Sequence, residues 1–184
     1  MAADGSTNSG RWSPATIWLH WIGAILILAA LGIGWAAEHL TERNAQPLIY
    51  EIHFSLGLLA LAVTLARIGY RLSHRRPDRS LQPLPARFAA STVHLLLYLT
   101  TFGALLSGLI NFLFLGPVRV FGVISVPRLF DPEADEWLRA LSWYAHIYCW
   151  WALAGLIALH ASAAFFHHLI RRDRTLRDFL PTQS

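Results

Sequence analysis

Hydrophobic residues in this chain are concentrated in four long stretches, separated by shorter segments that hold most of the charged residues. Crossing a hydrocarbon core of about 30 Å takes about 20 residues of helix, and each stretch is at least that long. The composition agrees, since 55% of the residues are hydrophobic and only 14% are charged. The pattern therefore predicts an all-α integral membrane protein, a four-helix bundle with spans at residues 14–37, 48–70, 87–116 and 141–170.

The polar segments predict how the spans are connected. Residues 1–10 are small and polar without periodicity, so we expect a disordered arm before one membrane domain at 11–181. The short connection at 38–47 makes the first two spans antiparallel neighbours. Three prolines exclude a regular helix over residues 77–85, which we interpret as a linker. The longer third connection, 117–139, is expected to form a small lid.

The distribution of charge predicts the orientation in the membrane. All 15 basic residues are arginine, and 11 of them lie before the first span, in or next to the second connection, or after the fourth span. Because positively charged loops stay in the cytoplasm, we expect both termini there and the first and third connections in the periplasm of a bacterial inner membrane. The same arginines favour contact with anionic lipid and give no support to nucleic-acid binding.

Four histidines lie at matched depths in these spans. His146 and His160 are 14 residues apart on the fourth span, a rise of about 21 Å, and they share a face because 14 residues make nearly four turns. Counting along the other spans places His20 level with His160 and His53 level with His146. An ionisable side chain in a bilayer must be satisfied by a partner. Two haem irons, each held by two neutral imidazoles, would satisfy all four histidines.

Two other interpretations of the histidines stay open at this point. They could be four separate polar groups, each hydrogen-bonded to a neighbouring helix. A non-haem metal centre is the other alternative, but a di-iron site needs carboxylates in the bundle interior, where these spans have none.

Three further residues near the cytoplasmic level are candidates for the same chemistry. Arg67 and Arg71 end the second span where a haem bound by His20 and His160 would present its propionates, and a guanidinium suits a carboxylate. Both arginines could equally be ordinary cytoplasmic flanking charges. His94, near the start of the third span, is a candidate to bond a quinone carbonyl or to relay a proton, with an ordinary interfacial histidine as the alternative.

Several segments together resemble the prokaryotic cytochrome b561 family. They are W-L-H-W at 18–21, E-I-H at 51–53, the histidines at 146 and 160, and the ending H-H-L-I-R-R-D-R-T-L-R-D-F-L-P from residue 167. The resemblance covers about residues 10–181. It implies a four-helix membrane cytochrome with two b-type haems, whose axial ligands correspond to His20, His53, His146 and His160. One member type of this family oxidises superoxide and reduces ubiquinone.

We therefore expect a dihaem cytochrome that receives electrons at the His53/His146 level and delivers them to ubiquinone near the His20/His160 level. Superoxide is the leading donor by resemblance, although the periplasmic connections carry four arginines against seven acidic residues, which would repel an anion. The alternative is an electron-transfer subunit that serves a separate periplasmic redox protein. An alternative of another class is a non-redox membrane scaffold or transporter.

Overall fold

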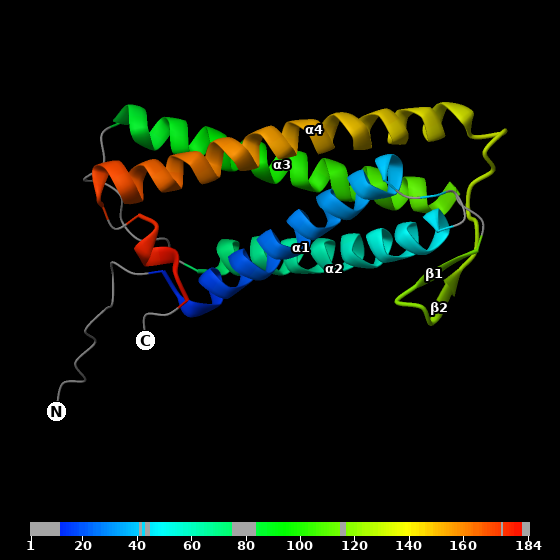
Figure 1. The fold of residues 1–184 in the computed structure, drawn as a ribbon, viewed down its shortest axis with the longest axis horizontal. Helices are drawn as coiled ribbons and strands as arrows, with labels where there is room; N and C mark the ends of the chain where they lie inside the picture. The colour runs from blue at the N-terminus through cyan, green and yellow to red at the C-terminus, as the bar shows by residue number, and fades with distance from the viewer. Residues whose placement is uncertain are drawn as a thin grey trace.

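The computed structural model describes residues 12–40, 42, 45–74, 84–114, 117–173 and 175–181. Four long helices dominate the fold (Figure 1), and each is long and apolar enough to cross a membrane. They are α1 (Pro14–His39), α2 (Gln46–Ser73), α3 (Leu84–Phe114) and α4 (Glu136–Phe166). The predicted four-helix membrane architecture is therefore confirmed, with span ends that differ from the expected ones by a few residues.

The helix starts follow from local sequence. Ser13 accepts a hydrogen bond from the Thr16 backbone N–H at 3.2 Å, and proline occupies the first position of α1. Helix α3 begins at Leu84, so residues 84–85 are helical and the predicted linker is shorter than expected. Proline at residue 85 is compatible with this, because the first turn of a helix needs no N–H donor. The rest of that linker and the predicted arm at 1–10 lie outside the described residues.

The helices form two antiparallel hairpins, α1 with α2 and α3 with α4, which meet each other mainly through α2 and α3. We call the end with the start of α1 and the finish of α4 the terminal end, and the opposite end the loop end. Buried positions are mostly small residues, as expected where membrane helices pack closely. They include Ala37, Ala60, Ala104, Ser55, Thr64, Thr101, Ser107 and Ser142.

The third connection adds a short β-hairpin to a fold predicted as all-α. Strands β1 (Val118–Val120) and β2 (Ile124–Val126) pair antiparallel, with Val120 opposite Ile124. The hairpin lies beside the first turns of α2 (Figure 1). After it, the backbone N–H groups of Leu129 and Phe130 bind the Leu113 carbonyl near the end of α3. The predicted lid is thus a hairpin on α2 followed by a segment across α3.

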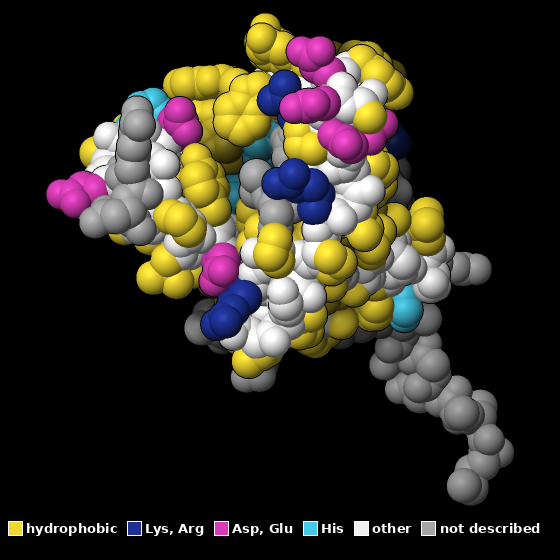
Figure 2. All heavy atoms as spheres, turned by 90° about the vertical axis from the view of Figure 1, so that its right-hand side faces the viewer, with side chains coloured by type: hydrophobic (Ala, Val, Ile, Leu, Met, Phe, Trp, Pro, Cys, Tyr) yellow, Lys and Arg dark blue, Asp and Glu magenta, His cyan; other side chains and the backbone are white. Residues whose placement is uncertain are grey.

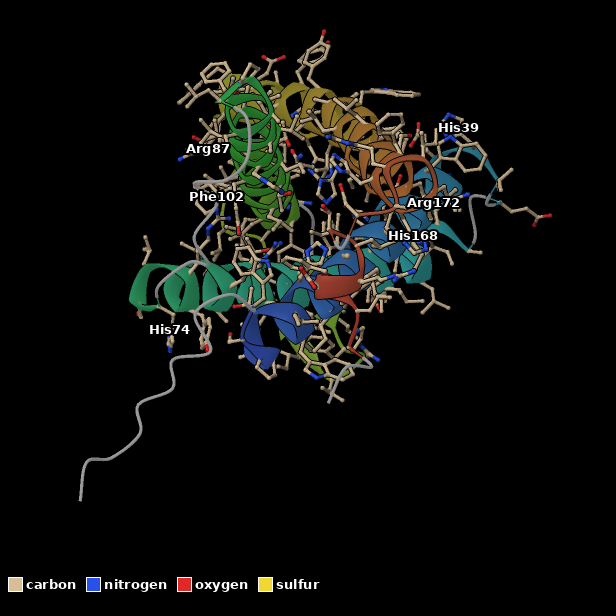
Figure 3. All side chains as sticks on the ribbon, turned by 90° about the vertical axis from the view of Figure 1, so that its left-hand side faces the viewer. His39, His74, Arg87, Phe102, His168 and Arg172 are labelled. Carbon is tan, nitrogen blue, oxygen red and sulfur yellow. The ribbon has the colours of Figure 1, made fainter. Side chains whose placement is uncertain are left out.

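At the terminal end the chain folds back after α4. A π-helical turn (His167–Arg171) continues α4, and Arg172 then takes a left-handed conformation with φ of 53°. Figure 3 looks onto this end and labels Arg172 where the chain reverses. A 3-10 turn (Arg177–Phe179) follows, and the Trp21 indole N–H donates to the Phe179 carbonyl at 2.6 Å. The C-terminal segment is thereby attached to α1.

Two histidine pairs as candidate cofactor sites

The four histidines of the spans form two pairs in the structure. The ring centroids of His20 and His160 are 6.3 Å apart, and those of His53 and His146 are 6.0 Å apart. These are the two pairs expected from depth. One lies toward the terminal end and the other toward the loop end. In both pairs α4 supplies one ring, and α1 or α2 supplies the other.

The loop-end pair is oriented by backbone carbonyls of neighbouring helices. His53 Nδ1 lies 3.0 Å from the Ala30 carbonyl on α1, and His146 Nδ1 lies 2.9 Å from the Ala104 carbonyl on α3. A neutral imidazole that donates through Nδ1 presents the lone pair of Nε2. This is the usual second-shell arrangement of a metal-binding histidine.

Each loop-end imidazole also rests on a glycine. A Cβ atom on Gly34 would lie 2.9 Å from His53 Cε1, and a Cβ on Gly108 would lie 2.9 Å from His146 Cε1. Such a distance is too short for real contacts, so any larger residue would push the ring away. Both glycines follow, by four residues, the alanine whose carbonyl binds the same ring. Each histidine therefore contacts one turn of the neighbouring helix twice.

An apolar cavity surrounds the loop-end pair, and all four helices line it. Its walls include Leu31, Leu61, Phe112 and Trp150 besides the two histidines. Figure 2, which faces the loop end, shows a hollow with histidine (cyan) in its depth. An aromatic macrocycle with an apolar edge suits such walls, because the cavity offers it dispersion contacts without unpaired polar groups.

The terminal-end pair has a more polar and more aromatic environment. His20 Nδ1 is buried and has no hydrogen-bond partner. The Phe179 ring lies 5.3 Å from the His20 ring, and the His94 ring lies 5.4 Å from the His160 ring. The structure thus brings the predicted residue His94 next to the pair. Phe179 was not predicted from the sequence.

The two arginines predicted near this level share a tyrosine. Arg71 Nη1 donates to the Tyr98 hydroxyl at 3.0 Å, and both guanidinium groups lie over the Tyr98 ring, at 5.4 Å for Arg67 and 5.2 Å for Arg71. No acidic side chain pairs with either arginine among the residues that the structure describes. Two cations on α2 beside an aromatic ring are available to an anionic group.

The C-terminal segment is closed by a contact between the His167 ring and the Asp173 carboxylate. His167 Nδ1 lies 2.5 Å from Asp173 Oδ2, and the Thr175 N–H donates to Asp173 Oδ1 at 3.0 Å. Burial opposes ionisation of this carboxyl, but the hydrogen bonds from His167 and Thr175 prevail and lower its pKa to about 2. Asp173 is therefore a carboxylate at any ordinary pH and keeps the chain folded back toward α1.

The arrangement of the predicted ligands in the structure fits a haem. Two imidazoles on opposite sides of one metal ion place their ring centres about 6 Å apart, because each metal–nitrogen bond is about 2 Å long and each ring centre lies about 1 Å beyond its nitrogen. Within the described part of the chain, no group of three or more His, Cys, Asp or Glu side chains could hold a metal ion. Each histidine pair leaves most coordination positions of an iron ion to another group, and a haem would supply them.

Sequence reasoning missed the residues that position these rings. Gly34 and Gly108 were not singled out, although the alanine and glycine four residues apart recur on α1 and α3.

Asn111 was also missed. Its carbonyl oxygen accepts from Ser142 at 2.7 Å, and its buried amide nitrogen has no partner. An asparagine within an apolar span was the available signal.

Comparisons with known proteins identify the family to which this chain belongs. The family model described as prokaryotic cytochrome b561 matches residues 11–182. Cytochrome b561 homolog 1 of Escherichia coli K12 is 31% identical over 93% of this chain and 97% of its own length. Cytochrome b561 homolog 2 of the same organism is 30% identical over 95% and 93%. Probable superoxide oxidase CybB of Yersinia pestis is 28% identical over 93% and 96%. This chain therefore belongs to the prokaryotic cytochrome b561 family of haem b membrane proteins, which transfer electrons.

Proposed function

We propose that this protein is a dihaem cytochrome that carries electrons across the membrane to ubiquinone, with His20, His160, His53 and His146 as the axial ligands. The observation that carries the proposal is the spacing of the rings. Two pairs, each contributed by two different helices, have centroid separations of 6.3 and 6.0 Å, which suit one metal ion per pair. Family membership favours electron transfer over a non-redox scaffold or transporter.

The chain contributes ligation, orientation and exclusion of water. His53 and His146 present Nε2 toward the cavity because their Nδ1 atoms bind the carbonyls of Ala30 and Ala104. Bound between each pair, a haem b supplies a reversible one-electron carrier. The apolar side chains around the loop-end pair keep water from the ligands, and the 14 residues from His146 to His160 on α4 correspond to a rise of about 21 Å.

We place the terminal end in the cytoplasm of a bacterial inner membrane. This rests on the 11 arginines that lie before α1, in the last turns of α2, between α2 and α3, in the first turn of α3 and after α4 in the sequence, which are also available to anionic lipid. In this orientation the loop-end pair lies toward the periplasm.

The polar side chains around His20 and His160 suit the delivery of electrons and protons to a quinone. Reducing a quinone to a quinol takes two electrons and two protons, and the protons must arrive by a polar route. His94, whose ring lies 5.4 Å from the His160 ring, would hold a proton and donate it to a quinone carbonyl. Arg67 and Arg71 would bind a haem propionate, and this is supported by their position at Tyr98 without an acidic partner among the described residues.

Superoxide is the leading electron donor, with molecular oxygen as its oxidised product. The support is the similarity to the Yersinia pestis protein whose name is probable superoxide oxidase. The charge of the loop end favours the second candidate, an electron-transfer subunit that exchanges electrons with a separate periplasmic redox protein. Seven acidic residues against four arginines give this end a net negative charge, which repels an anion and attracts a basic protein surface.

Stopped-flow absorption spectroscopy of the purified protein distinguishes these functions. With an enzymatic source of superoxide, we expect rapid reduction of the haem bands and formation of ubiquinol. A bis-histidine haem spectrum without any reaction with superoxide would favour the subunit. A colourless protein that takes up no haem would contradict the entire proposal.

A further inference from the structure

The tip of the β-hairpin is apolar and exposed, and it lies outside the helical bundle. No charged residue occurs from Val120 to residue 127. Exposed fractions are 50% for Phe121, 80% for Val123 and 56% for Ile124. We call residues 121–124 the hairpin tip. An exposed apolar cluster of this kind on a protein surface indicates a site where a membrane or another protein binds.

The inward edge of the hairpin is bound to α2 by two backbone N–H groups. The Arg119 N–H donates to Glu51 Oε1 at 3.3 Å, and the Phe121 N–H donates to Ser55 Oγ at 2.9 Å. The donors are two residues apart on a strand, which is about 7 Å. The acceptors are four residues apart on a helix, which is about 6 Å. Strand β1 therefore runs beside α2 in the same direction, from the loop end toward the middle of the bundle.

The second hydrogen bond fixes the depth of the tip. Helix α2 has 28 residues and begins at Gln46, so it is about 42 Å long and, if centred, extends about 6 Å beyond each side of a 30 Å hydrocarbon core. Ser55, nine residues from the start, then lies about 8 Å inside the boundary. Glu51 lies near the boundary itself, where a carboxylate can reach water.

Two backbone N–H groups of the hairpin tip have hydrogen-bond acceptors inside the protein. In hydrocarbon each backbone polar group without a partner is costly, so a segment that enters it needs hydrogen-bond partners inside the protein. The Phe121 N–H has the Ser55 hydroxyl, and the Val123 N–H binds the Val120 carbonyl at 3.2 Å. The Ser55 hydroxyl in turn donates to the Glu51 carbonyl at 2.8 Å. The turn has positive φ at Phe121 and Gly122, as tight hairpin turns commonly do.

We infer that the hairpin tip inserts into the hydrocarbon of the leaflet at the loop end and that lipid acyl chains cover it. The tip continues the exposed apolar face of α2, where Leu48, Ile52 and Leu59 are 61%, 41% and 42% exposed. Ser55 acts as the buried acceptor that makes this depth possible. The third connection is thus fixed between α2 and the bilayer.

Depth-dependent fluorescence quenching tests this inference on the full, haem-loaded chain. Cys149 is the only cysteine, so Cys149→Ser gives a background in which one introduced cysteine can be labelled. Val123→Cys carries an environment-sensitive fluorophore at the tip, and Glu133→Cys in the same connection is the matched control. The protein is placed in phosphatidylcholine and phosphatidylglycerol vesicles, with or without nitroxide groups on the acyl chains. The haem spectrum confirms that each variant is folded.

We expect acyl-chain nitroxide to quench the label at 123 several-fold more than the label at 133, and aqueous iodide to show the reverse order. In the labelled Val123→Cys protein, Ser55→Ala is expected to weaken acyl-chain quenching, because the Phe121 N–H loses its acceptor. Equal access of iodide to both labels would overturn the inference. Shielding of the tip from both quenchers would also overturn it, since protein rather than lipid would then cover the hairpin.

Discussion

The loop-end histidines are fixed by the main chain, whereas the terminal-end histidines are surrounded by side chains that carry charge or protons. His53 and His146 each contact a carbonyl and a glycine of a neighbouring helix. His20 has an unpartnered Nδ1, and its neighbourhood includes His94 and Arg67 near His160. Rigid, dry ligation suits a group that only passes electrons on. A polar environment suits a reduction step that takes up protons together with electrons.

Removing the proposed ligands tests most directly whether each histidine pair binds its own haem. Alanine at His53 or His146 is expected to abolish the loop-end haem and leave the other, and alanine at His20 or His160 is expected to do the opposite. The reason is that one imidazole cannot replace a bis-histidine pair. Pyridine haemochrome quantification and a redox titration of each variant measure this. Equal haem loss from both levels in every variant would refute the two-pair arrangement.

The glycines test whether backbone contacts make the loop-end pair rigid. Gly34→Ala and Gly108→Ala would place a methyl group 2.9 Å from an imidazole carbon, so we expect loss of most of the loop-end haem with the terminal-end haem retained. Gly32→Ala on α1 is the matched control, because its new Cβ would meet nothing within 4 Å. It is expected to keep both haems and to raise stability by up to about 1 kcal/mol through helix propensity.

Haem content and thermal unfolding in detergent measure both effects. If Gly34→Ala bound haem as well as Gly32→Ala, the contact between α1 and the His53 ring would have no role in ligation. The loop-end site would then be held by its side chains alone, and its difference from the terminal-end site would disappear.

The sequence predicted the parts of this architecture that depend on a single helix. Span positions follow from apolar length, and the level pairing of His146 with His53 follows because the rise per residue of a helix is fixed. The glycine contacts were not predictable, since their meaning depends on which helix face meets which ring. The alanine and glycine of α1 matter only because α2 places His53 against them.

Two features outside the helices were missed for other physical reasons. The strands of the hairpin have three residues each, which is too short for an alternating pattern to be recognised. Phe179 reaches His20 through a chain reversal at Arg172, a non-glycine residue with positive φ. Such a conformation is uncommon and has no clear signature in a single sequence.

Arg67 tests whether a nearby charge sets the midpoint potential of the terminal-end haem. A fixed positive charge near a redox centre stabilises the added electron, so Arg67→Gln is expected to lower the midpoint potential of the terminal-end haem by on the order of tens of millivolts. The loop-end potential should stay unchanged. Arg71→Gln is the control, because Arg71 lies one turn nearer the end of α2, and its effect should be smaller. Spectroelectrochemical titration of the three proteins measures the shifts, and equal shifts at both haems would contradict the assignment.

Phe179 is expected to give the smallest effect. Its ring contacts the His20 ring edge-on, and its carbonyl accepts from the Trp21 indole, so the C-terminal segment shields the terminal-end pair from water. Phe179→Ala should therefore leave haem content intact, alter the low-spin electron paramagnetic resonance signal of the terminal-end haem and shift only its potential. Phe179→Leu keeps an apolar cover and is the matched control. If the signal of the loop-end haem moved equally, the segment would act on the whole bundle, and the shielding of one pair by its own surroundings would be refuted.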